Sequence, residues 1–335
     1  MMRLDFAMPD AQSRRELGER LARLQQRAAL VTLLREGLPD EPDPENADAT
    51  LVSLHPDRFV LRVATAAGRV YACKAYVGDR GRELFALHRQ IAADCARRHV
   101  DCPVWSPLAY LPSERLLISP WLDGPTLSGS LVDDGRPQLL AAAAAALATL
   151  HGSAVAPEAP TPAATILAAT RARGERLCRK WPEAADLVRP LLLRLAEIVP
   201  VLDAALPVLV HGDAAPEHFL WASRGPVLLD LDMFGCTEAA YDVGHFLAQL
   251  ERLCLSHPRL APRASASVAT FRDAYLAVMP VSARNIAFYH GLSLTRKLST
   301  VRRLKPQGWT QLVPILAARA RSALTAAMEG DERGL

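Results

Sequence analysis

Apolar and polar residues alternate with two different periodicities along the chain, one typical of helices and one typical of strands. Residues 11–37 have apolar positions at three- and four-residue spacing and end at Gly37, which predicts a helix. Residues 38–50 are rich in proline and acidic side chains and predict a loop. From residue 50 to 122, short β-rich runs separated by turn residues predict a small antiparallel sheet, interrupted by one amphipathic helix over 81–99.

After Gly124 the rhythm becomes mostly helical. It predicts helices over 136–152, 162–180, 183–198, 240–255, 264–278, 283–300 and 309–328. Two short apolar runs interrupt this pattern, "PVLVHGD" (207–213) and "GPVLLDLD" (225–232), and they predict two strands joined by a loop and a turn. A β-rich part followed by a helical part with an embedded hairpin predicts a bilobal α+β protein.

Composition narrows the class of protein. A chain of 335 residues is long enough for two lobes, and a net charge of +3 is too small to indicate nucleic acid or a membrane surface as a partner. The longest apolar run, 139–150, is shorter than the ~20 residues of a membrane span, and the first residues lack a secretory h-region. The six cysteines form no CxxC pair, so we expect reduced thiols in a cytoplasmic protein.

Four residues occur in the order that phosphoryl transfer to a hydroxyl requires. Such a reaction needs a cation for nucleotide phosphates, a carboxylate that orients it, a base and a carboxylate for a metal ion. Lys74 lies on the third predicted strand, and Glu83 begins the next helix. Asp213 and Asp230 each end an apolar run, so we expect both carboxylates on the same side of the molecule. Singly, each has an ordinary structural explanation, but the set is specific.

The set resembles the aminoglycoside phosphotransferase and choline kinase-like superfamily of small-molecule kinases. The resemblance covers about residues 50–255 and rests on three further segments: "LLISPWLDGPTL" (116–127), "LATLHG" (147–152) and "LLDLDMFGCTEAAYDVGHFLAQL" (228–250). It implies a bilobal protein-kinase-like fold of α+β class. It also implies an N-terminal helix and linker over 1–48, a β-rich nucleotide-binding lobe over 49–118, and a helical lobe over 119–335.

The resemblance also implies roles for individual residues. Lys74 would hold the nucleotide phosphates, oriented by Glu83, and Asp213 would be the catalytic base. Asp230 would be the principal Mg²⁺ ligand and Asp232 a second carboxylate near the metal. The further residues implied are a structural histidine and two hinge residues against the nucleotide: His211, Ser119 and Trp121. The donor would be ATP or GTP and the acceptor a hydroxyl group of a small molecule.

Two features depart from the family pattern. The family carries an asparagine metal ligand five positions after the catalytic aspartate, and His218 stands there. Imidazole suits Mn²⁺ better than it suits Mg²⁺. One alternative is a single Mg²⁺ on Asp230, with or without Asp232, and His218 hydrogen-bonded to the loop or to a phosphate. Another is the use of Mn²⁺, and a third is a catalytically silent scaffold. The turn "LHPDRF" (54–59) lacks the expected glycine, and Arg58 is either its phosphate contact or an ordinary turn residue.

The charge of the C-terminal part bears on the acceptor. Between Arg252 and Met328 the only acidic residue is Asp273, whereas arginines are frequent. This disfavours a polycationic aminoglycoside and favours a neutral or anionic sugar-like acceptor or metabolite. The helix segment 294–306 is the candidate anion-facing surface, with these acceptor residues: Arg296, Arg302 and Arg303. Two histidines are predicted to be core or helix-end residues outside the site: His151 and His245.

Overall fold

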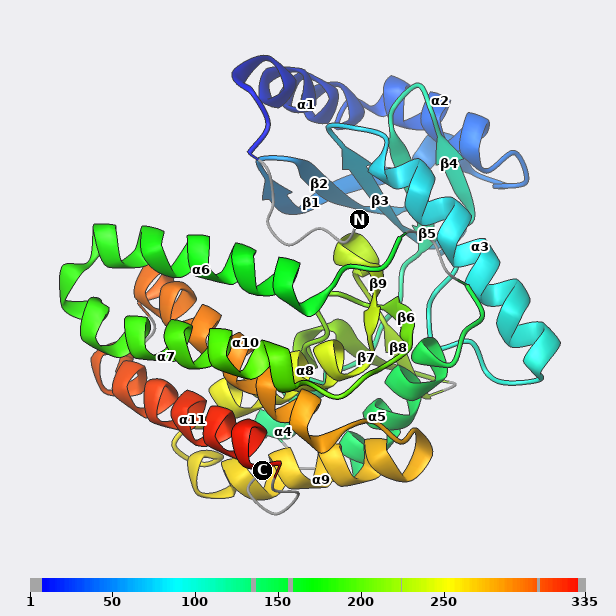
Figure 1. Cartoon of the computed structure of the whole chain (residues 1–335). Coiled ribbons are helices and arrows are strands. Elements are labelled where there is room, and N and C mark those ends of the chain that lie inside the picture. Colours follow the sequence, from blue (N-terminus) through cyan, green and yellow to red (C-terminus); the bar gives the residue numbers. More distant parts are fainter. Residues whose placement is uncertain (1–7, 134–136, 156–158, 224, 306–307, 331–335) are drawn as a thin grey trace. The chain divides into compact units, whose positions relative to one another are not determined.

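The computed structural model describes residues 8–133, 137–155, 159–223, 225–305 and 308–330 (Figure 1). The chain divides into two compact units, the first running to Asp123 and the second starting at Gly124. In the part of the chain described, no helix is both long and apolar enough to cross a membrane.

The first unit is built on a five-stranded antiparallel sheet with the strand order β1-β2-β3-β5-β4. Its main elements are α1 (Ala11–Leu24), α2 (Arg27–Gly37), β1 (Asp48–His55), β2 (Arg58–Ala64), β3 (Val70–Tyr76), α3 (Arg80–Arg98), β4 (Ala109–Leu111) and β5 (Leu116–Pro120). This confirms the predicted sheet and its single inserted helix. The helix predicted over 11–37 is instead two helices, because the backbone of Gln26 is extended (ψ 129°).

Alternation of side chains across the sheet places Lys74. Phe59 and Leu61 of β2 and Cys73 of β3 are buried with the leucines of α1 and α2 in one core cluster, so these two helices cover that face of the sheet. Successive residues of a strand point to opposite faces. Lys74 pairs with Val60 and Leu117 in the middle of the sheet, and its side chain therefore lies on the other face.

The second unit is mostly helical. Its main elements are α4 (Leu127–Asp133), α5 (Gln138–His151), α6 (Ala163–Lys180), α7 (Ala185–Ile198), β6 (Pro207–Val210), β7 (Phe219–Ala222), β8 (Gly225–Leu228), β9 (Gly235–Glu238), α8 (Ala240–Leu255), α9 (Ala264–Val278), α10 (Ala283–Leu304) and α11 (Trp309–Glu329). Helix α10 packs against α6, α7, α8 and α11 (Figure 1). The predicted helices are confirmed; the seven-residue α4 was too short to show a helical period.

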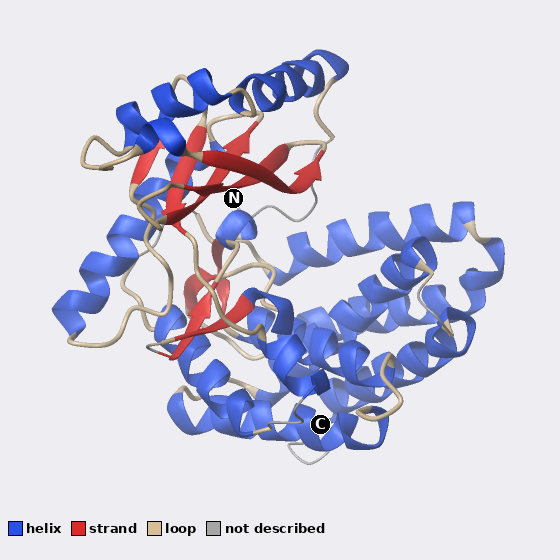
Figure 2. Cartoon of the chain, turned by 180° about the vertical axis from the view of Figure 1, so that it is seen from behind, coloured by secondary structure: helices blue, strands red, loops and turns tan. Residues whose placement is uncertain are grey.

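Two short two-stranded sheets carry the loops that contain Asp213 and Asp230 (Figure 2). Strand β6 pairs with β9, and β7 pairs with β8, all antiparallel. This differs from the predicted pairing of 207–213 with 225–232. The four-residue strands show too little alternation to indicate their partners, and β9 comes later in the chain than either predicted strand.

Candidate active site

One buried carboxylate accepts hydrogen bonds from the backbone of the loop that follows β6. Asp242 lies in the first turn of α8 and is 0% exposed. Its Oδ2 accepts the backbone N–H of His211 at 2.5 Å, and its Oδ1 accepts the backbone N–H of Gly212 at 2.9 Å. The N-terminus of a helix also favours a negative charge. The backbone immediately before Asp213 is thereby fixed.

His151, the last residue of α5, completes the surroundings of Asp242. Its Nε2 lies 3.0 Å from Asp242 Oδ2, and its Nδ1 lies 2.6 Å from the hydroxyl of Tyr275. Burial alone would raise the pKa of Asp242, but the hydrogen bond from His151 and the N–H donors of the loop lower it on balance. The carboxylate therefore stays ionised, and its charge is satisfied by N–H groups.

Close contacts tie this loop to the segment that carries Asp230. Gly212 has a positive φ (+84°), and a Cβ at this position would lie 1.9 Å from the carbonyl oxygen of Met233, so only glycine fits. His211 Nε2 lies 2.8 Å from the Leu229 carbonyl oxygen, and the Leu229 N–H donates to the His218 carbonyl at 2.8 Å. The structure thus brings the loop of Asp213 and the loop of Asp230 together.

The two predicted metal carboxylates lie at a tight turn after β8. Asp230 has a left-handed backbone (φ 62°, ψ 58°) and precedes a 3₁₀ turn over Leu231–Met233, which contains the buried Asp232. Among the described residues, no three His, Cys, Asp or Glu side chains form a ready-made metal cluster.

Asp213 is held but accessible. Its side chain is 40% exposed, and its Oδ1 lies 2.9 Å from Nε2 of His245. Burial opposes ionisation of Asp213, but the hydrogen bond from His245 and the nearby charge of Lys297 hold its pKa well below the usual range. The group is therefore a fixed, ionised carboxylate with an exposed part.

His245 orients Asp213 from α8, one turn after Asp242. Burial lowers its pKa, so the imidazole is neutral near pH 7. Its Nε2–H donates to Asp213, and its Nδ1 lies 3.3 Å from the hydroxyl of Ser293 on α10. Gln249 lies 3.2 Å from Nε2 on the other side. His151 and His245 were predicted to be core or helix-end residues; both are buried, His151 ends α5, and both also contact the carboxylates of this region.

His218 stands beside Asp213 with one ring nitrogen engaged. Its Nδ1 lies 2.8 Å from the Asp213 carbonyl oxygen, and because a carbonyl only accepts, Nδ1 carries the proton. The Nε2 of this tautomer has a free lone pair. The ring stacks on His211 with centroids 5.7 Å apart and planes 12° apart, which fixes its direction.

The predicted nucleotide residues lie in the first unit. Glu83 forms an ion pair with Arg80 on the same helix at 2.6 Å, and Arg58 pairs with Asp57 at 3.0 Å. The Lys74 ammonium lies 5.5 Å from the centroid of the Tyr76 ring. The predicted hinge residues lie at and after the end of β5. Ser119 pairs with Ala72 of β3, and the backbone N–H of Trp121 donates to the Val70 carbonyl at 2.8 Å.

The predicted acceptor residues of α10 do not gather in one place. Arg296 is buried and donates to the Tyr241 hydroxyl at 3.3 Å. The guanidinium of Arg302 lies over two indole rings, 5.3 Å from the centroid of Trp181 and 5.2 Å from that of Trp309, whereas Arg303 is exposed. Lys297, which the sequence did not single out, is the α10 cation whose charge acts on Asp213.

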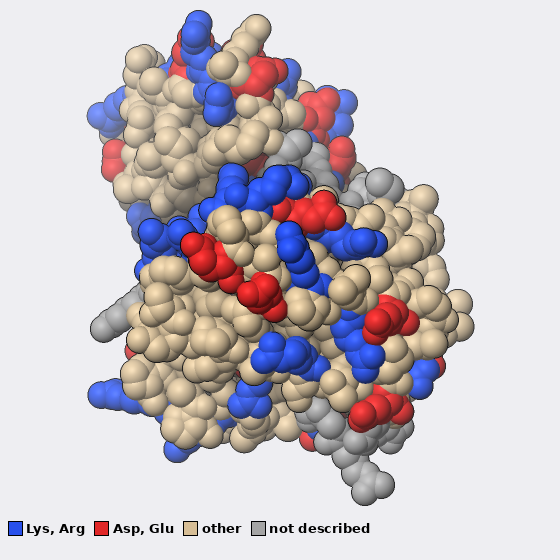
Figure 3. Space-filling view, turned by 60° about the vertical axis from the view of Figure 1, so that its left-hand side comes forward, with Lys and Arg blue, Asp and Glu red and all other residues tan. Residues whose placement is uncertain are grey.

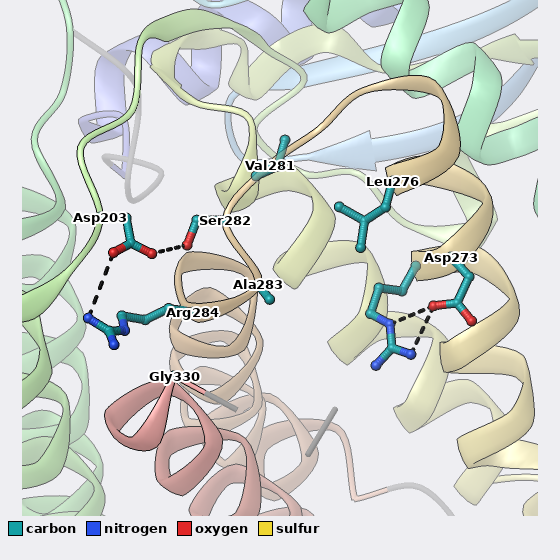
Figure 4. A pocket seen from close by; sticks show the side chains of 9 residues that line it. Asp203, Asp273, Leu276, Val281, Ser282, Ala283, Arg284 and Gly330 are labelled. Atoms are coloured by element: carbon teal, nitrogen blue, oxygen red, sulfur yellow. Dashed lines mark hydrogen bonds and ion pairs between the residues drawn. The ribbon is translucent and has the colours of Figure 1, made fainter. Parts of the chain in front are cut away.

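A cavity of about 420 Å³ in the second unit is separate from these groups (Figure 4). Its charged lining groups are paired with each other: Arg284 lies 3.7 Å from Asp203, and Arg272 lies 2.8 Å from Asp273. None of its lining residues belongs to the predicted site. The charges at its wall are thus already compensated, and the cavity is not part of the predicted site around Asp213.

Comparison with known proteins identifies the fold. Residues 55–277 match the model of the phosphotransferase enzyme family. The choline kinase of Cryptosporidium parvum Iowa II is similar in structure (TM-score 0.61, 11% identity, 91% of this chain and 95% of that one). So are an amicoumacin kinase in complex with AMP-PNP, Ca²⁺ and Ami (0.59, 14%, 92% and 96%) and a macrolide 2'-phosphotransferase of Brachybacterium faecium (0.54, 17%, 90% and 98%). No curated protein sequence matches significantly. The predicted kinase-like α+β class is confirmed.

Replacing Asp242 tests its role as the anchor of the loop. Asp242→Asn removes a buried charge from its N–H donors and presents an amide N–H to them, so we expect the free energy of unfolding to fall by about 3–5 kcal/mol. Urea unfolding followed by circular dichroism measures this loss. Asp273→Asn, at a side chain that is 64% exposed, is the matched control and should change stability by less than about 0.5 kcal/mol. Equal losses in both variants would contradict the anchor role.

Proposed function

Because the chain belongs to the phosphotransferase enzyme family, we propose that it is a small-molecule kinase that transfers the γ-phosphoryl group of ATP or GTP to a hydroxyl group. The observation that carries this proposal is the Asp213 carboxylate, which is ionised, oriented by His245 at 2.9 Å and 40% exposed. A catalytic base must be held in one orientation and still be reachable by the proton it accepts.

The proposed reaction uses Asp213 as the base. The acceptor oxygen forms a bond to the γ-phosphorus, and the bond from that phosphorus to the β–γ bridging oxygen breaks, its electron pair going to the nucleoside diphosphate. The acceptor hydroxyl gives its proton to Asp213. The lowered pKa of Asp213 makes it a weak base, which fits a loose transition state in which the proton leaves late.

The first unit supplies the proposed nucleotide contacts. Lys74 would bind the α- and β-phosphates, since its side chain leaves the sheet on the face opposite the core of α1 and α2. Glu83 would orient Lys74 while one of its two carboxylate oxygens pairs with Arg80. Arg58 is the proposed further contact with the phosphates. Ser119 and Trp121 are the proposed contacts with the nucleobase.

The metal site is proposed on Asp230, with Asp232 and His218. Mg²⁺ in kinases is held by one or two carboxylates and completed by phosphate oxygens, so the lack of a closed cluster in the described residues fits this chemistry. The free lone pair at Nε2 of His218 also suits Mn²⁺. A bound divalent ion would neutralise charge on the phosphates during transfer.

The acceptor is proposed to be a neutral or anionic hydroxyl compound. The similar structures include kinases named for choline, amicoumacin, macrolides and aminoglycosides, so this fold is compatible with unrelated acceptors. The scarcity of acidic residues between Arg252 and Met328 does not favour a polycation. We therefore propose a sugar-like compound or another metabolite as the acceptor, rather than an aminoglycoside.

Asp213→Asn tests the proposed activity. Consumption of ATP and of GTP is screened against a panel of hydroxyl metabolites with Mg²⁺ or Mn²⁺. The variant should lower kcat on a turned-over acceptor by about 10²–10⁴-fold, since it removes the base, while nucleotide binding persists. Thermal shifts with nucleotide and metal measure that binding. No shift in the wild-type chain with any combination would instead indicate a catalytically silent scaffold.

His245→Ala tests the orientation of the base. Loss of a hydrogen bond to a charged group costs about 1.5–3 kcal/mol, so we expect kcat to fall by roughly ten- to a hundredfold with little change in the KM for nucleotide. His245→Gln, which restores an N–H donor, should recover part of the rate. His257→Ala is the control, because the hydrogen bond of the His257 side chain goes to the Leu253 carbonyl near the end of α8. Equal kcat in the Ala and Gln variants would rule out an orienting role.

His218→Asn tests the metal preference. The amide keeps an N–H for the Asp213 carbonyl and presents a harder oxygen ligand, so Mg²⁺-dependent turnover should be retained or raised. The ratio of Mn²⁺- to Mg²⁺-supported kcat should fall by about tenfold, the scale on which changes at metal shells act. Electron paramagnetic resonance of Mn²⁺ with ADP measures binding separately. Loss of turnover with both metals would reveal a direct catalytic role of His218.

A further inference from the structure

One face of α10 is directed toward the catalytic loop. Ser293 contacts His245, and Arg296, three residues later, donates to Tyr241 of α8. Residues three and four apart share a helix face. Lys297 is four residues after Ser293, so it lies on the same face, one turn along from the residue that holds His245. The charges of Lys297 and Asp213 act on each other accordingly.

Lys297 differs from the surrounding basic residues in its pairing. Arg252 forms an ion pair with Glu217 at 3.0 Å, and Arg173 donates to the hydroxyls of Ser299 and Thr300 at 2.7 and 3.1 Å. Lys297 makes no hydrogen bond or ion pair of its own within the described ranges. An ammonium group has three donors, and Lys297, whose side chain is half-buried, engages none of them with an acceptor among the described residues. A ligand anion would satisfy it.

One face of the molecule shows no segregated basic patch (Figure 3). On the face of the molecule drawn in Figure 3, basic and acidic side chains are interspersed rather than segregated. A mixed surface produces little long-range field, since opposite charges screen each other over short distances. Selection of an anionic molecule then depends on a local cation at the site.

We propose that Lys297 is a specificity residue that binds an anionic group, a carboxylate or a phosphate, on the hydroxyl acceptor beside Asp213. This inference rests on the proposed function and names the class of its substrate. Anchoring the anion at Lys297 presents a neighbouring hydroxyl of the same molecule to the Asp213 carboxylate. The acceptor is therefore a small hydroxy acid or a phosphorylated polyol.

The local charges also predict how this binding depends on pH. Burial lowers the pKa of Lys297 to about 8, against the attraction of Asp213. The titratable groups that interact with it are two acids, two arginines and one histidine: Asp213, Glu217, Arg173, Arg252 and His245. Below this pKa the ammonium is charged and binds an anion; binding weakens as the pH rises through about 8. A bound anion raises the pKa of Lys297 in return.

Lysine NMR of the full chain tests the proposal without requiring turnover. The sequence has four lysines, Lys74, Lys180, Lys297 and Lys305, so ¹³Cε-lysine labelling gives few signals and substitution assigns them. The probes are glycerol, glycerate and glycerol 3-phosphate, which share hydroxyl groups and differ in the anion. We expect glycerate or glycerol 3-phosphate to shift the Lys297 signal and raise its pKa, and glycerol to do neither.

Lys297→Met should weaken binding of the anionic probe about tenfold or more, whereas Lys297→Arg should keep much of it. Lys305→Met, at the exposed end of the same helix, is the control and should bind like the wild type. Melting temperatures of all variants establish that they fold. An anionic probe that shifts only Lys74, or that binds Lys297→Met unchanged, overturns the proposal.

The same measurements separate the two levels of inference. If an anionic probe binds at Lys297 but no hydroxyl compound supports ATP or GTP consumption, the proposed kinase function fails and the anion site stands. If neutral acceptors are phosphorylated as well as anionic ones in both the wild type and Lys297→Met, the kinase stands and the role of Lys297 is refuted.

Discussion

The buried charge of Asp242 is the constraint on which the candidate site depends. An ionised carboxylate at 0% exposure is tolerated only while N–H donors surround it. Two of its donors are the backbone N–H groups of His211 and Gly212, and a third comes from His151. The loop cannot change conformation without leaving this charge unsatisfied. The position of Asp213, one residue further on, follows from the electrostatics of a group that itself does no chemistry.

Helix α8 extends this control from the loop backbone to its side chains. Asp242, His245, Gln249 and Arg252 are spaced by three and four residues and share one helix face. The first binds the loop backbone, the second orients Asp213, the third contacts the second, and the fourth pairs with Glu217 in the turn before β7. A rigid helix therefore sets several distances at once, which would suit the proposed role of Asp213 as a base.

The sequence predicted those parts of the site that local patterns determine. Asp213 and Asp230 follow apolar runs that form strands, and Lys74 lies on a strand whose alternation is visible in the residue types. His245 was predicted to be a core or helix-end residue, and it is buried; its contact with Asp213, 32 residues earlier in the chain, left no local signal apart from its three-residue spacing from Asp242. Arg302 was predicted at the acceptor, and its guanidinium lies over the rings of Trp181, which follows α6, and of Trp309 in α11. Such tertiary contacts leave no local trace in the sequence.

The histidine at position 218 can be understood from the two tasks of the asparagine that the family pattern places there. An asparagine amide donates through its nitrogen and offers its oxygen to a metal ion. His218 performs the first task, since its Nδ1 donates to the Asp213 carbonyl at 2.8 Å. That bond forces the lone pair onto Nε2, and stacking on His211 holds the ring in place. The loop therefore keeps its support while the offered ligand changes from a hard oxygen to a softer nitrogen. A change of metal preference without a change of loop structure is what this geometry favours over loss of the site.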